Sequence, residues 1–227
     1  MKRLFSFVFI FVLVLTLVAF SFGCSKQEEK QPTKQEPAKT QEPAQTGEPA
    51  GQTLDVLVSE EFFGLCKGKK VYASTCGQAD LETLGIIVED GLESLDMEDP
   101  TVYQNDLVAA DVEDGSVVLL VVGGSNKGLG AAKTDVASEA ARASEFASKA
   151  EAGKITLVVI HIGGTARRGD TSDPIIKAAA PSADLLLVVA EGNGDGYFTN
   201  VSSEHDIPLF LYSKTSKMKA SFVKLFE

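Results

Sequence analysis

Five runs of apolar residues constrain the fold of this chain more than any other feature, because each is apolar at consecutive positions. A strand with one face in water alternates apolar and polar side chains, whereas a strand buried on both faces is apolar throughout. The runs therefore predict parallel strands that helices cover on both faces. They span residues 70–75, 116–122, 155–162, 184–190 and 207–212, and a weaker strand is expected at 101–104.

Segments with helical spacing lie between these runs. Residues 79–95 and 134–150 carry apolar side chains three or four positions apart, and Asp173 followed by Pro174 is a start signal for a short helix. Residues 54–67 are interpreted as a helix on the edge of the sheet. Strands that alternate with helices join through right-handed crossovers. The pattern predicts an α/β fold with a doubly wound, mostly parallel open sheet of about five or six strands, in a Rossmann-like or flavodoxin-like three-layer sandwich.

Residues 1–23 have the pattern of a secretory signal, because Lys2 and Arg3 precede an apolar stretch that ends at Gly23. The stretch resembles a bacterial lipoprotein signal, in which the following cysteine, here Cys24, is diacylated, commonly with palmitate. The resemblance implies cleavage before Cys24 and a lipid on that cysteine. The alternative is an uncleaved membrane anchor. In both cases the chain after Cys24 is expected to be exported and held at a bacterial membrane.

Residues 24–53 contain no aromatic residue and repeat the sequence EPA. Such a segment buries too little apolar surface to offset its ordering entropy, so a disordered tether is predicted, followed by a single domain at 54–227. The whole chain has a net charge of −11. This acidity disfavours nucleic acid and anionic lipid surfaces as partners. Membrane attachment is therefore expected through the lipid on Cys24.

The two remaining cysteines, Cys66 and Cys76, are separated by a predicted strand. A strand rises about 3.3 Å per residue, which carries the two Cα atoms far beyond the roughly 7 Å limit for a disulfide. Two free thiols are predicted.

Three of the predicted strands are followed by glycine-rich segments of one kind. Each segment combines glycines with Ser, Thr or Asn and with a charged residue. In open α/β sheets, ligands bind outside the carboxyl ends of the strands, and glycine lets backbone N–H groups approach a ligand closely. The segments read GGSNKG at 123–128, GGTARRG at 163–169 and EGNGDG at 191–196.

These segments are interpreted as one site for a small anionic or polar ligand, such as a carboxylate, phosphate or sulfate, because their Lys and Arg side chains add positive charge. The alternative is that they are ordinary turn and cap residues, and that the arginines pair with the surplus acids. Residues 123–133 have no apolar stripe and are expected to form a long loop, where about 2–6 residues are usual, and long ordered loops are often functional. The residues expected to bind the ligand are Gly123, Gly124, Ser125, Asn126, Lys127, Gly163, Gly164, Thr165, Arg167, Arg168, Asn193 and Asp195.

An enzyme is the first alternative. An envelope hydrolase or transferase would use Cys76 with His161, or Ser125, because a nucleophile needs an adjacent base and the chain has only two histidines. The pair of Cys76 and His161 requires neighbouring strands and side chains on the same face. The competing interpretation is a small buried thiol and a hydrogen-bonded core histidine. The sequence leaves open whether the chain is an enzyme.

No metal and no cofactor are expected, because Asn193 and Asp195 offer too few oxygen ligands for calcium. Flavin is the alternative: STCGQ at 74–78 resembles a flavodoxin phosphate loop, and Tyr197 with Phe198 would then face the flavin ring. A protein-partner module is a further alternative, with the same two aromatic residues as its apolar contact.

The segment GGSNKGLG at 123–130 also resembles the glycine motif of short-chain dehydrogenases. In that family the motif follows the first strand, whereas here a strand and a helix precede it, and no Tyr of this chain has Lys four positions later. A Walker phosphate loop needs Gly-Lys-Ser/Thr, but Lys127 precedes Gly128. Neither nucleotide motif is present.

Together, VVGGSNKGLGAA, HIGGTARRGDTSD and EGNGDGYFT resemble a family of exported bacterial α/β domains of unassigned function, commonly lipoproteins. The resemblance covers most of residues 70–227. It implies the fold and export, and it implies no particular chemistry. Cys76 stands where a small residue such as alanine is expected before Gly77.

Overall fold

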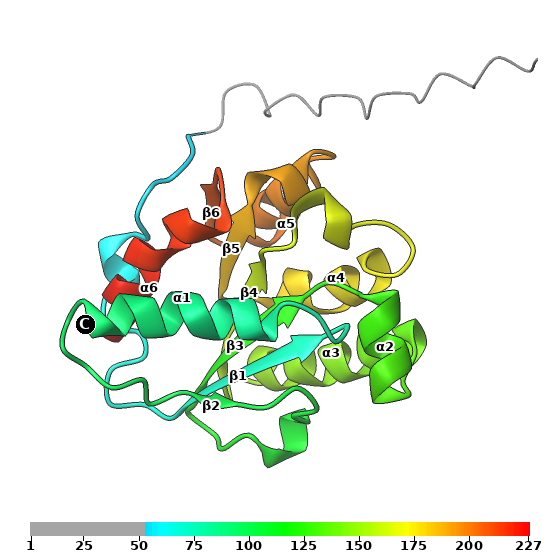
Figure 1. Cartoon of the computed structure of the whole chain (residues 1–227), viewed down its shortest axis with the longest axis horizontal. Coiled ribbons are helices and arrows are strands. Elements are labelled where there is room, and N and C mark those ends of the chain that lie inside the picture. The colour runs from blue at the N-terminus through cyan, green and yellow to red at the C-terminus, as the bar shows by residue number, and fades with distance from the viewer. Residues whose placement is uncertain (1–52) are drawn as a thin grey trace, which may run out of the picture. The chain divides into compact units, whose positions relative to one another are not determined.

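The computed structural model describes residues 53–227, which form one open sheet of six parallel strands (Figure 1). The strands follow the spatial order β2-β1-β3-β4-β5-β6. This confirms the predicted α/β fold with a doubly wound parallel sheet. The predicted signal peptide, Cys24 and the predicted tether up to residue 52 lie outside the described residues. The strands are β1 (Val71–Cys76), β2 (Val102–Tyr103), β3 (Val117–Val122), β4 (Thr156–His161), β5 (Leu185–Val189) and β6 (Leu209–Tyr212).

Helices cover both faces of the sheet. The α-helices are α1 (Leu81–Glu93), α2 (Asn126–Ala132), α3 (Val136–Glu151), α4 (Asp173–Ala179), α5 (Tyr197–His205) and α6 (Lys219–Phe226). Short 3-10 helices are η1 (Glu60–Phe62), η2 (Ala109–Asp111), η3 (Gly164–Arg167), η4 (Ala180–Ser182), η5 (Ala190–Asn193) and η6 (Thr215–Met218). In Figure 1, α1 and α6 lie in front of the sheet and α3 and α4 lie behind it.

Two apolar clusters fill the space between the layers, and every strand except the exposed β2 contributes to both. In β3, Val118 and Leu120 belong to the cluster that includes α3, α4 and α5, whereas Val117 and Leu119 belong to the cluster that includes α1 and α6. Successive side chains of a strand point to opposite faces, so a strand buried on both sides is apolar at every position. This is the physical reason for the continuous apolar runs.

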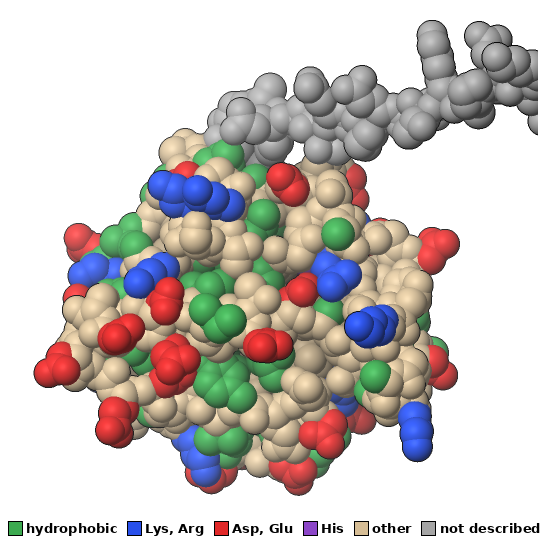
Figure 2. Space-filling model, in the orientation of Figure 1, with side chains coloured by type: hydrophobic (Ala, Val, Ile, Leu, Met, Phe, Trp, Pro, Cys, Tyr) green, Lys and Arg blue, Asp and Glu red, His purple; other side chains and the backbone are tan. Residues whose placement is uncertain are grey.

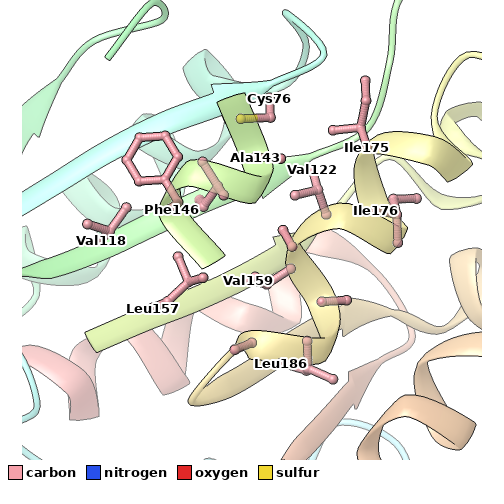
Figure 3. Close-up of a cluster of buried hydrophobic side chains, with 14 of the residues drawn as sticks. Cys76, Val118, Val122, Ala143, Phe146, Leu157, Val159, Ile175, Ile176 and Leu186 are labelled. Carbon is pink, nitrogen blue, oxygen red and sulfur yellow. The ribbon is translucent and has the colours of Figure 1, made fainter. Parts of the chain in front are cut away.

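Part of the first cluster is shown in Figure 3, where Phe146 and Ala143 of α3 lie beside the side chains of β3 and β4. Ile175 and Ile176 of α4 extend the same cluster. Phe146 is fully buried. Full burial of a side chain of this kind stabilises a fold by about 1.5–3 kcal/mol.

The order of the strands reverses beside β1. From β1 the chain continues to β2 on one side, then crosses to β3 on the other side and continues outward through β4, β5 and β6. The carboxyl ends of β1 and β3 therefore form the switch point, where open α/β sheets bind ligands.

Two elements differ from the prediction. Residues 123–133 are not one long loop, because α2 occupies most of them and Ser125 caps it by accepting the N–H of Gly128 at 3.2 Å. Leu129 is the one buried residue of α2, so no apolar stripe marks this helix in the sequence. The predicted helix at 54–67 is also wrong: the segment contains only the single turn η1.

The segment that contains η1 is held against α6 by backbone hydrogen bonds. The N–H of Gly64 donates to the carbonyl oxygen of Lys224, and the N–H of Cys66 donates to that of Leu225, both at 2.8 Å. Cys66 and Cys76 are buried free thiols, as predicted. Within residues 53–227, no helix is both long enough and apolar enough to cross a bilayer.

Candidate functional site

The three glycine-rich segments lie at one edge of the sheet, because β3, β4 and β5 are consecutive neighbours. They also contact one another through the segment after η3. The N–H of Gly124 donates to Oγ of Ser172 at 2.8 Å, and Oγ1 of Thr171 donates to Oδ1 of Asn126 at 3.2 Å. The structure therefore brings the predicted segments together into one surface.

Close approach between these segments explains several of the glycines. A Cβ atom on Gly124 would lie 2.1 Å from the carbonyl oxygen of Thr171, and one on Gly192 would lie 2.3 Å from Cδ2 of His161. A Cβ on Gly163 would lie 1.9 Å from Cγ of Arg167. No larger residue fits at these positions without displacing its neighbour, so packing within the fold requires these glycines whether or not a ligand binds.

Arg168 connects the segments that follow β4 and β5. Its guanidinium donates to Asp173 at 2.9 Å, to Asp195 at 2.7 and 2.9 Å, and to the carbonyl oxygen of Gly192. Burial by itself lowers the pKa of Arg168, but the hydrogen bonds to Asp195 and Asp173 raise it overall. The side chain is only 14% exposed. Arg168 therefore pairs with acidic residues, as the alternative to a ligand site predicted, and these partners occupy its N–H groups.

Asn193 and Asp195 hold the start of α5. Oδ1 of the buried Asn193 accepts the N–H of Phe198 at 2.9 Å, and its amide donates to Oγ1 of Thr199 at 2.7 Å. Asp195 accepts the N–H of Tyr197 at 3.1 Å, and the hydrogen bond from Arg168 lowers its pKa. Both side chains are therefore engaged in the turn before the helix.

Arg167 extends across the switch point. Its Nε donates to Oδ2 of Asp80 at 3.1 Å, which joins the segment after β4 to the segment after β1. Between these two segments, the Cβ of Arg167 lies 3.1 Å from the position that a Cβ on Gly123, at the end of β3, would occupy. Among residues 53–227, Nη1 and Nη2 of Arg167 have no hydrogen-bond partner. Four charged N–H groups therefore remain for a ligand at this edge.

Other polar groups surround Arg167 on the same edge. Lys127 and Thr165 are exposed, and their side chains form no hydrogen bond with another described residue, whereas Ser125 is occupied as the cap of α2. Glu191 also lies here, with Oε2 3.0 Å from the position that a Cβ on Gly164 would occupy. The edge therefore carries both charge signs, and Arg167 and Lys127 are its cations with unfilled donors.

Two buried charged side chains beside this edge, Glu139 and Arg142 of α3, were not predicted from the sequence. Oε2 of Glu139 accepts the N–H of Gly77 at 2.7 Å and Nη2 of Arg142 at 2.5 Å. Arg142 also donates to the carbonyl oxygens of Thr75 and Leu107. This buried ion pair fixes the backbone at the end of β1.

A signal for Glu139 was present in the sequence. Glu139 precedes Ala143 and Phe146 by four and seven positions, which places a carboxylate on the buried face of α3. A charge in an apolar stripe is informative, because buried charges require a partner.

The proposed catalytic residues lie apart. Cys76 ends β1 and His161 ends β4, and β3 lies between these strands, so the condition of neighbouring strands is not met. Burial raises the pKa of the Cys76 thiol to about 12, which keeps it protonated. Nδ1 of His161 lies 2.9 Å from the carbonyl oxygen of Val122, and Nε2 lies 3.2 Å from that of Gly164. Burial lowers the pKa of His161. Within the described residues, neither side chain hydrogen-bonds to the other or to Ser125.

Tyr197 and Phe198, which were expected to face a flavin or a partner protein, do not both lie at the surface. Phe198 is fully buried, 5.4 Å from the ring of His161, and only Tyr197 reaches the surface. The exposed large apolar side chains are elsewhere, at Val56, Phe63, Ile86, Met97, Val102 and Tyr103. Residues 53–227 contain no group of three or more His, Cys, Asp or Glu side chains arranged to hold a metal ion.

Comparison with known proteins identifies a family and no activity. No curated protein and no solved structure matches the chain. A family model described as "Domain of unknown function (DUF6305)" matches residues 68–226, which include all six strands. The chain therefore belongs to the DUF6305 family.

Proposed function

We propose that this protein is an extracytoplasmic binding domain, anchored through a lipid on Cys24, that takes up a small anion at the carboxyl edge of its sheet. The observation that carries the proposal is the position of Arg167, which spans the switch point with both terminal nitrogens unpaired among the described residues. A guanidinium binds carboxylate and phosphate in a two-pronged geometry. Asp80 already accepts the hydrogen bond from Nε of Arg167, which leaves the opposite side of the guanidinium for a ligand.

The contacts of the other residues that were predicted to bind the ligand indicate different roles for them. Arg168, Asn193 and Asp195 support the edge by connecting its segments, and they do not contact the ligand in this proposal. Lys127, in the first turn of α2 after β3, supplies a second charge at the same edge of the sheet. The glycines allow the segments to approach one another.

The test is binding of defined anions to the whole chain in detergent. Titration calorimetry with phosphate, sulfate and succinate is expected to show binding of at least one anion, and Arg167→Gln should weaken it at least about tenfold, because a hydrogen bond to a charged group contributes about 1.5–3 kcal/mol. Lys177→Gln on α4, which also removes one exposed cation, serves as the matched control. Equal affinity in the Arg167→Gln variant contradicts the proposal, and so does a panel in which no anion binds.

The lipid anchor is tested separately in the producing bacterium. An alkyne-labelled palmitate should be incorporated into the wild-type chain and not into Cys24→Ser, and the variant should leave the membrane fraction. Label on the Cys24→Ser variant would show that another residue carries the lipid. A wild-type chain without label would remove the anchor from the proposal.

A further inference from the structure

A groove lies between α1 and the segment that contains β2. It has a volume of about 520 Å³ and is lined by Leu81, Glu82, Gly85, Ile86, Glu89, Asp99, Tyr103 and Asn105. Figure 2 shows hydrophobic side chains bordered by acidic ones on the face that carries α1 and β2. The predicted partner surface at Tyr197 and Phe198 lies elsewhere, so this groove is a separate feature.

The walls of the groove expose large apolar side chains. Ile86 of α1 is 55% exposed, and Tyr103 of β2 is 37% exposed. Single exposed apolar residues are normal on a protein surface, but a cluster with polar borders is typical of an interaction site. Covering these side chains would contribute about 25 cal/mol for each Å² of apolar area removed from water.

Gly85 opens the groove at the middle of α1. Its neighbour across the groove is Tyr103, because a Cβ on Gly85 would lie 3.5 Å from Cε1 of that ring. This is an ordinary van der Waals contact, so alanine would fit without strain. Glycine within a helix costs roughly 0.5–1 kcal/mol relative to alanine. The helix therefore has a destabilising residue where packing within the fold does not require one.

The border of the groove is acidic. Glu82, Glu89 and Asp99 line it, and the last two also line an adjoining hollow of about 850 Å³ that has Asp90, Glu93, Asp96, Met97 and Glu98 on its walls. No Lys or Arg lines either hollow. Within residues 53–227, none of these carboxylates forms an ion pair with Lys or Arg. Like charges gathered in this way repel one another, and a cationic partner would relieve that repulsion.

The chemistry of the surface selects among occupants. A second copy of this chain would place the same acidic border against itself, which is unfavourable. The N-terminal segment at 24–53 contains lysines but no aliphatic side chain larger than alanine, so it would leave the apolar wall uncovered. A partner that fits needs positive charges on both sides of a large apolar side chain.

We propose that the groove formed by Gly85, Ile86 and Tyr103 docks a peptide segment of a partner protein in which Lys or Arg residues flank an aliphatic or aromatic residue. The apolar residue occupies the space above Gly85. The flanking cations pair with Glu82 on one side and with Glu89 and the adjoining carboxylates on the other.

The probe is a fluorescent nine-residue peptide with a central leucine and lysines on both sides, measured by fluorescence anisotropy with the whole chain. Binding should weaken at least about tenfold in Gly85→Leu, which fills the groove with a side chain while the helix is retained, as circular dichroism and the melting temperature would verify. It should weaken at least about fivefold in the double variant Glu82→Gln/Glu89→Gln. The matched control, Glu145→Gln/Glu204→Gln, removes the same charge from α3 and α5 and should bind as the wild type does.

Four outcomes would overturn the proposal. The first is equal binding of a peptide with glycine in place of the central leucine, which would show attraction by charge alone. The second is a stable dimer of the chain that Gly85→Leu dissociates. The third is tighter peptide binding when residues 25–52 are removed, which would identify that segment as the occupant. The fourth is the absence of peptide binding up to millimolar concentration.

Discussion

Replacing Glu139 with alanine is expected to destabilise the fold strongly, because it leaves Arg142 as a buried charge without a counter-ion. The two side chains are 5% and 11% exposed, and Oε2 of Glu139 lies 2.5 Å from Nη2 of Arg142. The N–H of Gly77 loses its acceptor at the same time. Removal of one partner from a buried ion pair costs about 3–5 kcal/mol. This is a large share of the about 5–15 kcal/mol by which proteins are stable.

The free energy of unfolding is measured by urea denaturation at pH 7. The midpoint for Glu139→Ala should fall without a change in slope, since the surface exposed on unfolding stays the same. In a thermal melt, the loss corresponds to a decrease of roughly 6–20 °C for a domain of this size. Glu145→Ala on the same helix is the control, because Glu145 is exposed and its removal should change stability by at most about 0.5 kcal/mol.

A double variant separates the ion pair from the other contacts. Glu139→Leu/Arg142→Leu removes both charges, so its cost should be well below the sum of the two single costs, although the carbonyl oxygens of Thr75 and Leu107 lose their donor. Two results would refute the reasoning. One is a loss below about 1 kcal/mol for Glu139→Ala, and the other is simple additivity in the double variant.

Three further predictions concern the sheet edge. Gly124→Ala should destabilise by more than the roughly 1 kcal/mol typical of a single substitution, because its methyl group would lie 2.1 Å from the carbonyl oxygen of Thr171, and a thermal melt that matches the wild type would contradict the packing described for this edge. Burial lowers the pKa of His161 in the folded state, so between the two pKa values the folded chain binds fewer protons than the unfolded chain. The stability of the fold is therefore full above pH about 6.5 and falls as the pH drops below that value. Urea midpoints at pH 7 and pH 5 should therefore differ in the wild type more than in His161→Asn, and equal differences would exclude His161 as the cause. Because the thiol of Cys76 is buried with a pKa of about 12, a maleimide should modify it only after unfolding, and rapid labelling of the native chain would count against its burial.

The sheet was largely predictable because its strands carry their burial in the local sequence. Residues 117–122, for example, are apolar at every position, and the structure buries each of them. Helix α2 was not predictable in this way: Leu129 is its one buried residue, and its start depends on the cap at Ser125. A helix that contributes one side chain to the core has no periodic pattern to detect.

The candidate site was predictable in position and only partly in its residues. The glycine-rich segments after three strands indicated the correct edge, because parallel strands all end on the same side. Arg167 and Arg168 are neighbours in sequence and look equivalent there. In the structure, Arg168 is enclosed by Asp173 and Asp195, whereas Arg167 crosses to Asp80 and keeps four N–H groups unpaired among residues 53–227.

The sequence by itself determined the class of fold, the sheet edge on which the glycine-rich segments gather, and the free state of the two thiols at Cys66 and Cys76. Periodicity and composition report how each segment is buried, and burial is a local property. Only the tertiary structure decided which charges are already paired and where an apolar groove stays open. Those features depend on residues far apart in the chain, such as Arg167 with Asp80 and Gly85 with Tyr103, whose contacts exist only after the strands have taken their order.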